Sequence, residues 1–206
     1  MAPTDRRVRR TRDLLHRSLI ALILEKGYAR ITVQDILDRA DVGRSTFYTH
    51  YRDKDALLLD GGLDHLRAIL IDIPDEPNTT AGSAPVLPAA LAVFRLVDSN
   101  RRLYRAMIGN RGSDLILASA RTMLADVLAE QLRARLPRHD ARQLDVAVVF
   151  LVSALMGLIT WWLDEQVPLS APEMYVRFEN LATSGIAPLL SQPHPDPAAA
   201  SRAAHG

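Results

Sequence analysis

The chain has 206 residues, of which 25 are basic, 24 are acidic and none is cysteine. This length is enough for one or two domains with a buried core. The lack of cysteine excludes disulfide bonds, thiol nucleophiles and thiolate metal sites. Residues 1–12 are polar and arginine-rich and show no secretory signal, so we expect a cytoplasmic protein.

The net charge of +1 combines two unequal parts of the chain. Residues 1–60 contain 12 basic and 9 acidic side chains, and six of the basic ones fall within residues 1–17. Residues 61–206 contain 13 basic and 15 acidic side chains. The near-neutral total argues weakly against nucleic-acid binding, but the basic N-terminal part is suited to it.

Apolar residues recur with the helical period of 3.6 throughout, and strand-like alternation is nearly absent, which predicts an all-α fold. We expect a first helix over about 9–26, ended by Gly27 as a left-handed terminator. Thr32 is a good N-cap for a short second helix. After a turn at 41–43, a third helix is expected over about 44–51 and a fourth over about 53–72.

The stretch 74–88 contains four prolines and predicts a flexible connector. Further helices are expected at about 87–99, 102–109, 113–136, 140–165 and 171–186, the last with a capping box at Ser170 and Glu173. Residues 192–206 are predicted to be disordered. These boundaries give an N-terminal domain over 1–60, a helical domain over 61–191 and a tail.

Residues 32–54, TVQDILDRADVGRSTFYTHYRDK, carry the functional signal. Two short helices joined by a tight turn form a helix-turn-helix, whose second helix enters the DNA major groove. One set of apolar residues can form a shared core: Val33, Ile36, Ala40, Val42, Phe47 and Tyr51. The other face of the helix over about 44–51, which is the second of the helix-turn-helix, is polar and lacks carboxylates, as contact with phosphates and base edges requires.

Here the sequence resembles the TetR-type transcriptional regulators, over about residues 9–60. The matching residues are Glu25, Lys26, Gly27, Tyr28, Thr32, Val33, Asp35, Ile36, Ala40, Val42, Ser45, Thr46, Phe47, Tyr48, His50, Tyr51 and 53–58. Two positions depart from the family pattern. Asp41 replaces the usual turn glycine, and aspartate tolerates a left-handed conformation there. Arg44 occupies a position that is commonly small or polar.

The resemblance implies DNA-contacting roles for nine residues. Thr32 would anchor a phosphate at a helix N-terminus, and Gly43 would allow close backbone approach. Base edges would be contacted by Arg44, Ser45, Thr46 and Thr49, and phosphates by Tyr48, His50 and Lys54. A mobile arm with Arg6, Arg7, Arg9 and Arg10 could follow the DNA, or be an ordinary solvated tail. Tyr48 could instead be a packing residue.

The resemblance also implies that the second domain binds a small effector and dimerises through the helices at about 140–165 and 171–186. Large, adaptable side chains could line the effector pocket, although such residues fill cores more often. They are Phe94, Tyr104, Met107, Met123, Phe150 and Met156. The expected protein is a homodimeric, ligand-responsive repressor on a palindromic double-stranded DNA operator, or an activator.

Other functional classes have weaker support. Residues 146–163 are uncharged for 18 positions, near the lower limit for a membrane span, but a helix buried inside a bundle has the same composition. Residues 109–113 resemble a phosphate loop but lack its lysine, so we expect a connector with Ser113 capping the next helix. We expect no catalytic residue, cofactor or metal; an all-α interaction module without DNA affinity is the alternative.

Overall fold

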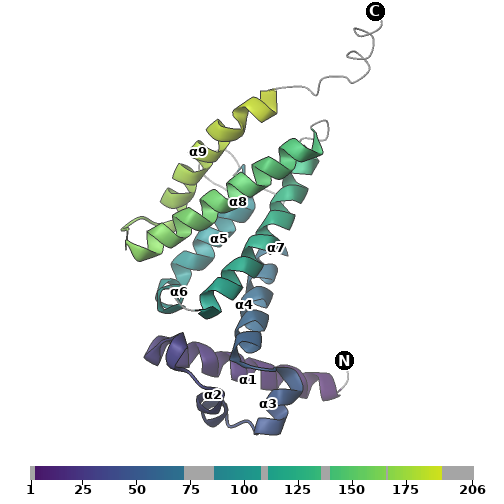
Figure 1. Cartoon of the computed structure of the whole chain (residues 1–206), viewed down its shortest axis with the longest axis vertical. Helices are drawn as coiled ribbons and strands as arrows, with labels where there is room; N and C mark the ends of the chain where they lie inside the picture. Colours follow the sequence, from purple (N-terminus) through teal and green to yellow (C-terminus); the bar gives the residue numbers. More distant parts are fainter. Residues whose placement is uncertain (1–2, 72–85, 108–110, 136–139, 166, 192–206) are drawn as a thin grey trace, which may run out of the picture.

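The computed structural model describes residues 3–71, 86–107, 111–135, 140–165 and 167–191 (Figure 1). Within them the chain forms nine α-helices and one short 3-10 helix, with no strand, which confirms the all-α prediction. The predicted tail at 192–206 and most of the predicted connector at 74–88 lie outside the described residues.

The N-terminal elements follow the expected order. They are α1 (Pro3–Lys26), η1 (Tyr28–Arg30), α2 (Val33–Ala40), α3 (Arg44–His50) and α4 (Lys54–Ile71). Asp53 starts α4 as expected, because its Oδ1 accepts a hydrogen bond of 2.7 Å from the backbone N–H of Ala56. The 3-10 turn η1, which the sequence did not reveal, packs the buried Tyr28 beneath α1.

The remaining helices are α5 (Pro88–Ser99), α6 (Arg101–Met107), α7 (Arg111–Arg135), α8 (Ala141–Asp164) and α9 (Ala171–Ser191). Glu173 accepts hydrogen bonds from the backbone and hydroxyl of Ser170, in the expected cap of α9. The expectation for Ser113 is wrong, because α7 already begins at Arg111 and Ser113 falls inside its first turn.

The arginine-rich N-terminus is helical from Pro3, which corrects the prediction of a mobile arm. A proline is well tolerated at the first position of a helix, and arginine is a good helix former. Arg6, Arg7, Arg9 and Arg10 are all exposed on this extension of α1. Figure 1 shows α1 lying across the base of the molecule, with its N-terminal end projecting beyond the other helices.

Local backbone geometry agrees with the sequence at Thr32 and Asp41 and in part at Gly27. Gly27 follows α1 with φ 74° and ψ 149°, a positive-φ conformation but not the left-handed helical one expected there, whereas Asp41 ends α2 in the left-handed region with φ 50° and ψ 49°. Thr32 caps α2: its Oγ1 accepts from the Asp35 amide at 3.2 Å, and Asp35 accepts from the Thr32 amide at 2.7 Å. Ion pairs Lys26–Asp35 and Arg39–Glu25 hold α2 against α1.

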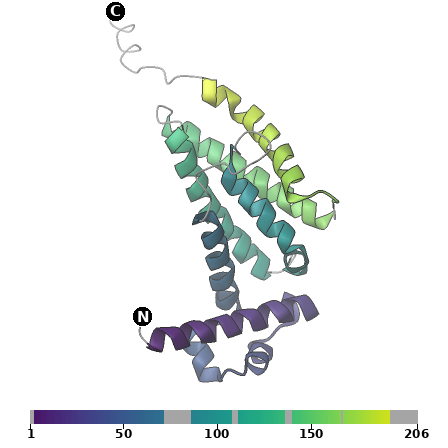
Figure 2. The same cartoon turned by 180° about the vertical axis from the view of Figure 1, so that it is seen from behind.

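The described part of the chain has two apolar cores that meet along α4. Leu57 and Leu58 belong to the N-terminal core, whereas Leu66 and Leu70 belong to the C-terminal core. Met107 of α6 is 5% exposed and lies in the N-terminal core, among residues of α1 to α4. Figures 1 and 2 show α4 running from the lower N-terminal domain into the upper helical body.

The C-terminal core is built around Phe94, Trp162 and Phe178, all at most 1% exposed. The ring centroid of Phe94 lies 5.8 Å from that of Trp162 and 6.0 Å from that of Phe178. Arg101 stacks 4.0 Å above the Trp162 ring and bonds to the backbone carbonyl of Leu169. These contacts join α5, α6, α8 and α9 into one body.

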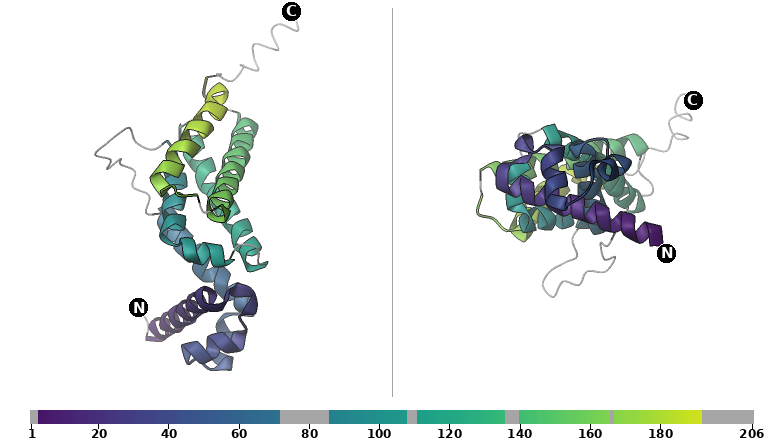
Figure 3. Two further views of the ribbon diagram at one scale, coloured as in Figure 1. Left: turned by 90° about the vertical axis from the view of Figure 1, so that its left-hand side faces the viewer. Right: turned by 90° about the horizontal axis from the view of Figure 1, so that it is seen from below.

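Helix α8 is the one described helix whose length and composition would suit a membrane span; its mean hydropathy reaches 2.3. Half of that window is buried, and its buried side chains belong to the C-terminal core. Figure 3 shows α8 and α9 side by side along one flank of the body. Packing in this core explains why the buried side of α8 is apolar.

Candidate nucleic-acid interface

The inner face of α3 fixes this seven-residue helix to the N-terminal domain. Phe47 is fully buried in the N-terminal core, and Tyr51, which follows the helix, is 5% exposed. Their ring centroids lie 5.9 Å apart. Both residues therefore belong to the core, as the spacing of apolar residues predicts.

The outer face of α3 is polar and open to solvent. Its exposed residues are Arg44, Ser45, Thr46, Tyr48 and Thr49, while His50 is half-buried. No residue of α3 is acidic, and Arg44 makes no ion pair with any described residue. The Thr49 hydroxyl donates to the Ser45 carbonyl at 2.9 Å, so it faces outward chiefly as an acceptor. Such a surface offers donors and acceptors to phosphates and base edges.

Tyr48 is 50% exposed, and its ring stacks edge-on against Phe47 with the centroids 5.3 Å apart. Half of the ring therefore packs on the core while the remainder is available at the surface. The packing role expected as the alternative is therefore present. The phosphate contact itself stays a prediction.

Gly43 and Thr32 stand at the N-termini of α3 and α2. The φ of Gly43 is −64°, and a Cβ there would lie 3.9 Å from its nearest neighbour, so the fold itself does not require glycine. At Thr32 the hydroxyl and the Asp35 carboxylate already bond to each other at 2.7 Å. Lys26 and Thr32 lower the pKa of Asp35, which keeps a negative charge where a phosphate would bind. An approaching phosphate would have to compete with this cap.

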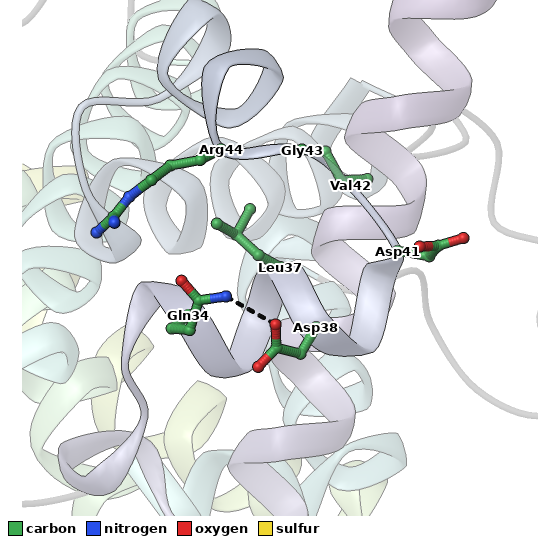
Figure 4. Close-up of a pocket in the computed structure, with 7 residues that line it drawn as sticks. All are labelled: Gln34, Leu37, Asp38, Asp41, Val42, Gly43 and Arg44. Carbon is green, nitrogen blue, oxygen red and sulfur yellow. Dashed lines mark hydrogen bonds between the residues drawn. The ribbon is translucent and has the colours of Figure 1, made fainter.

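A groove of about 460 Å³ separates α2 from α3 beside the turn (Figure 4). Gln34 and Arg44 extend from its two sides, and Gln34 donates to Asp38 at 2.7 Å. Asp41 points away from Arg44 in this view. Gln34 could not be predicted as part of this groove from the sequence, because one polar residue on an exposed helix face carries no local signal.

Lys54 has an interior role that the resemblance does not imply. Its Nζ donates to the backbone carbonyls of Ile31 at 2.7 Å and Tyr28 at 3.1 Å, and lies 4.5 Å from the Tyr28 ring centroid. Two of its three N–H groups therefore hold η1 against α4. A phosphate contact by the third remains a prediction.

Comparison with known proteins identifies the family. Residues 18–60 match the model described as "Bacterial regulatory proteins, tetR family", and residues 86–184 match a TetR-type model described as "Transcriptional regulator C-terminal region". Together the two matches span more than half of the chain. The chain belongs to the TetR family of transcriptional regulators. The match over 18–60 includes α2 and α3, which form the helix-turn-helix of this DNA-binding regulator.

Individual relatives agree with this assignment. The HTH-type transcriptional regulator YxbF of Bacillus subtilis is 46% identical over 55 residues, which are 26% of this chain and 14% of that protein. The HTH-type transcriptional regulator TcmR of Streptomyces glaucescens is 39% identical over 55 residues, 27% of this chain and 24% of that one. These matches thus span a quarter or less of each relative.

A solved structure extends the likeness to the whole fold. A TetR transcriptional regulator from Streptococcus agalactiae superimposes with a TM-score of 0.62 over 87% of this chain and 97% of that chain, at 22% identity. At this identity the likeness concerns the fold alone.

The six effector-pocket candidates of this TetR-family protein do not come together. Phe94, Tyr104, Met123 and Met156 lie in or against the C-terminal core, where burial raises the pKa of Tyr104 to about 12. Met107 belongs instead to the N-terminal core, because the end of α6 packs onto α1. Phe150 is 48% exposed, because it lies on the side of α8 turned away from the core. Met107 and Phe150 are therefore not kept as candidates for an effector pocket in the C-terminal core.

A second groove, of about 480 Å³, runs between α7 and α8. Of the pocket candidates it includes Met156, and it adds Arg121, Thr160 and Trp161. Within the described residues, His, Asp and Glu form no group of three that could hold a metal ion.

Proposed function

We propose that this TetR-family regulator is a homodimeric repressor that binds a palindromic operator and releases it when a small effector binds. The observation that carries the proposal is α3, which is anchored through the buried Phe47 and presents an exposed face without carboxylates. Arg44, Ser45, Thr46 and Thr49 would contact base edges, and Tyr48 and His50 would contact phosphates.

The homodimer is supported by an exposed apolar stripe on α8 and α9. Val146, Val149 and Leu181 are 67–68% exposed, and Phe150, Trp161 and Val176 are 47–50% exposed. Between them on α8 lie the small, exposed Ser153 and Gly157, which would let a partner helix approach closely. A soluble protein rarely leaves so many large apolar side chains exposed on two neighbouring helices, and symmetric pairing would bury them.

Pairing through α8 and α9 would place two copies of α3 on one side of the dimer. Recognition helices that meet successive major grooves are about 34–36 Å apart, and a two-fold axis makes the operator palindromic. The basic surface of α1, with Arg6, Arg9 and Arg10 exposed, would extend the contact with phosphates.

Effector response would pass through α4, since this helix contributes Leu57 to one core and Leu66 to the other. A ligand in the C-terminal body shifts the equilibrium only by binding one arrangement of the two domains more tightly. Phe94, Tyr104, Met123 and Met156 are the remaining candidates to contact it. We propose neither a catalytic activity nor a cofactor, and we place the protein in the cytoplasm.

The decisive experiment is selection of bound duplexes from a random pool by the purified full-length protein. Enrichment of an inverted-repeat consensus, with binding that weakens steeply with salt, is the expected result. Failure to enrich any consensus would favour an all-α interaction module. Placing the selected operator at different positions relative to a reporter promoter then distinguishes a repressor from an activator, and a ligand screen against the bound operator tests the effector response.

A further inference from the structure

A polar cluster joins three helices behind the recognition helix. Arg12 and His16 come from α1, Tyr51 follows α3, and Asp60 belongs to α4. The Asp60 Oδ2 atom accepts from the Tyr51 hydroxyl at 2.7 Å and from the Arg12 guanidinium, and lies 3.3 Å from His16 Nε2. Arg12 Nε in turn donates to the Tyr51 oxygen at 3.0 Å. One carboxylate thus holds side chains from two other elements.

The cluster is partly removed from solvent. The Asp60 side chain is 27% exposed and that of His16 is 22% exposed. The next residue, Gly61, lies against the His16 ring, because a Cβ there would lie 1.9 Å from His16 Nδ1. The His16 ring thus occupies the space that a side chain at position 61 would need. Partial burial strengthens the hydrogen bonds to Asp60 relative to the same bonds in water.

Tyr51 transmits this attachment to the recognition helix. Its backbone N–H donates to the Phe47 carbonyl at 2.9 Å, so the residue closes the last turn of α3. A seven-residue helix has little stability of its own, and its orientation depends on contacts at its ends and on its buried face. Phe47 supplies the buried face, and the Tyr51 hydroxyl supplies the C-terminal attachment.

We propose that Asp60, acting through Tyr51, is a positioning residue that sets the orientation of α3 for specific operator recognition. This inference rests on the proposed DNA-binding function. It predicts that loss of the Asp60 carboxylate lowers operator affinity, whereas the loss of a negative charge alone would raise it. Removing a carboxylate near DNA should strengthen binding to every duplex, whereas loss of a positioning contact should weaken binding to the operator alone.

The test compares Asp60→Asn with Asp64→Asn in the full-length protein. Both variants remove one negative charge from α4. The Asp64 side chain, however, is 59% exposed, and its carboxylate lies 3.8 Å from Arg12, too far for a hydrogen bond. Affinity is measured for the selected operator and for a scrambled duplex of equal composition, at a temperature where circular dichroism shows all variants folded. We expect Asp60→Asn to lose at least about tenfold in operator affinity. Its affinity for the scrambled duplex should follow that of Asp64→Asn.

A double-mutant cycle with Tyr51→Phe checks the route of the effect. If Asp60 acts through Tyr51, the double variant binds the operator no more weakly than the weaker single variant. Additive losses, or equal operator affinities for Asp60→Asn and Asp64→Asn, would overturn the inference. A wild-type protein that does not distinguish the operator from the scrambled duplex would instead remove the proposed function itself.

Discussion

The ammonium group of Lys54 lies over the ring of Tyr28, with Nζ 4.5 Å from the ring centroid. The same nitrogen bonds to two backbone carbonyls of the segment between α1 and α2. A lysine that the family resemblance assigns to a phosphate is therefore also part of the fold. Loss of DNA binding in a Lys54 variant would not by itself identify a phosphate contact.

Lys54→Met should lower the free energy of unfolding by about 1–3 kcal/mol, because two charge-assisted hydrogen bonds and a cation–π contact are lost. Chemical denaturation measures this change. The salt dependence of operator affinity separates the two roles. A lost phosphate contact lowers the log–log slope by about 1, whereas an unchanged slope would assign Lys54 to the fold alone.

Arg44→Ala should change the preferred operator sequence if Arg44, which is exposed at the start of α3, contacts a base as we propose. Repeating the duplex selection with the variant measures this directly. Arg39→Ala is a suitable control, because Arg39 is paired with Glu25 on α1. The same consensus with lower affinity would make Arg44 a backbone contact.

Gly27→Ala should destabilise the protein by about 1–3 kcal/mol, because φ 74° and ψ 149° lie in a region nearly restricted to glycine. No atom lies within 4 Å of the added Cβ, so backbone strain is the only cost. Thermal unfolding measures it. Gly43→Ala, at φ −64°, should leave stability within about 0.5 kcal/mol of wild type but weaken operator binding. A Gly43→Ala protein that binds normally would contradict close backbone approach there.

Stability should fall as the pH decreases from 7.5 to 5.5, on account of His16. Burial lowers the pKa of His16, against the opposing effect of Asp60, and Arg12 lowers it further. Below about pH 6.5 His16 binds a proton in the unfolded chain but stays neutral in the folded one. Protonation therefore stabilises the unfolded state and lowers the free energy of unfolding. Thermal unfolding of His16→Gln should show a smaller acid loss than wild type. His65→Gln, which replaces an exposed histidine of α4, should behave like wild type.

The pair Val149→Asp and Leu181→Asp tests the proposed dimer. Each places a charge on the exposed apolar stripe of α8 and α9, where it would be buried without a partner. We expect dimerisation to weaken about a hundredfold or more, as measured by light scattering on a sizing column. Ile71→Asp is the control, since Ile71 is 74% exposed and lies on α4. Dimers that survive both substitutions would place the interface elsewhere.

Local features of the helix-turn-helix could be predicted because neighbouring residues determine them. The cap at Thr32, the left-handed Asp41 and the terminator Gly27 each depend on a few adjacent positions. Burial of Phe47 followed from apolar spacing along α3. Helical periodicity likewise located α5 to α9 to within a few residues, apart from the longer C-terminal end of α9.

Contacts between distant residues could not be predicted in this way. Tyr51 fits the core by spacing, but its hydroxyl bonds to Asp60 nine residues later and to Arg12 thirty-nine residues earlier. Phe150 resembles a pocket residue in sequence, since nothing local distinguishes a half-exposed face of a helix from one that lines a pocket. Met107 joins the first core only because α6 folds back onto α1.

The position of Met107 bears on how this regulator could be engineered. A chimaera joined at residue 60, with this DNA-binding head on another helical body, would lack the Met107 side chain and the neighbouring Leu103 that packs against the same core. The donor head would then contain a void or admit water, at a cost of about 2–5 kcal/mol for a lost methionine. A working graft must carry α6 with the head or supply an apolar side chain of similar volume at the same place.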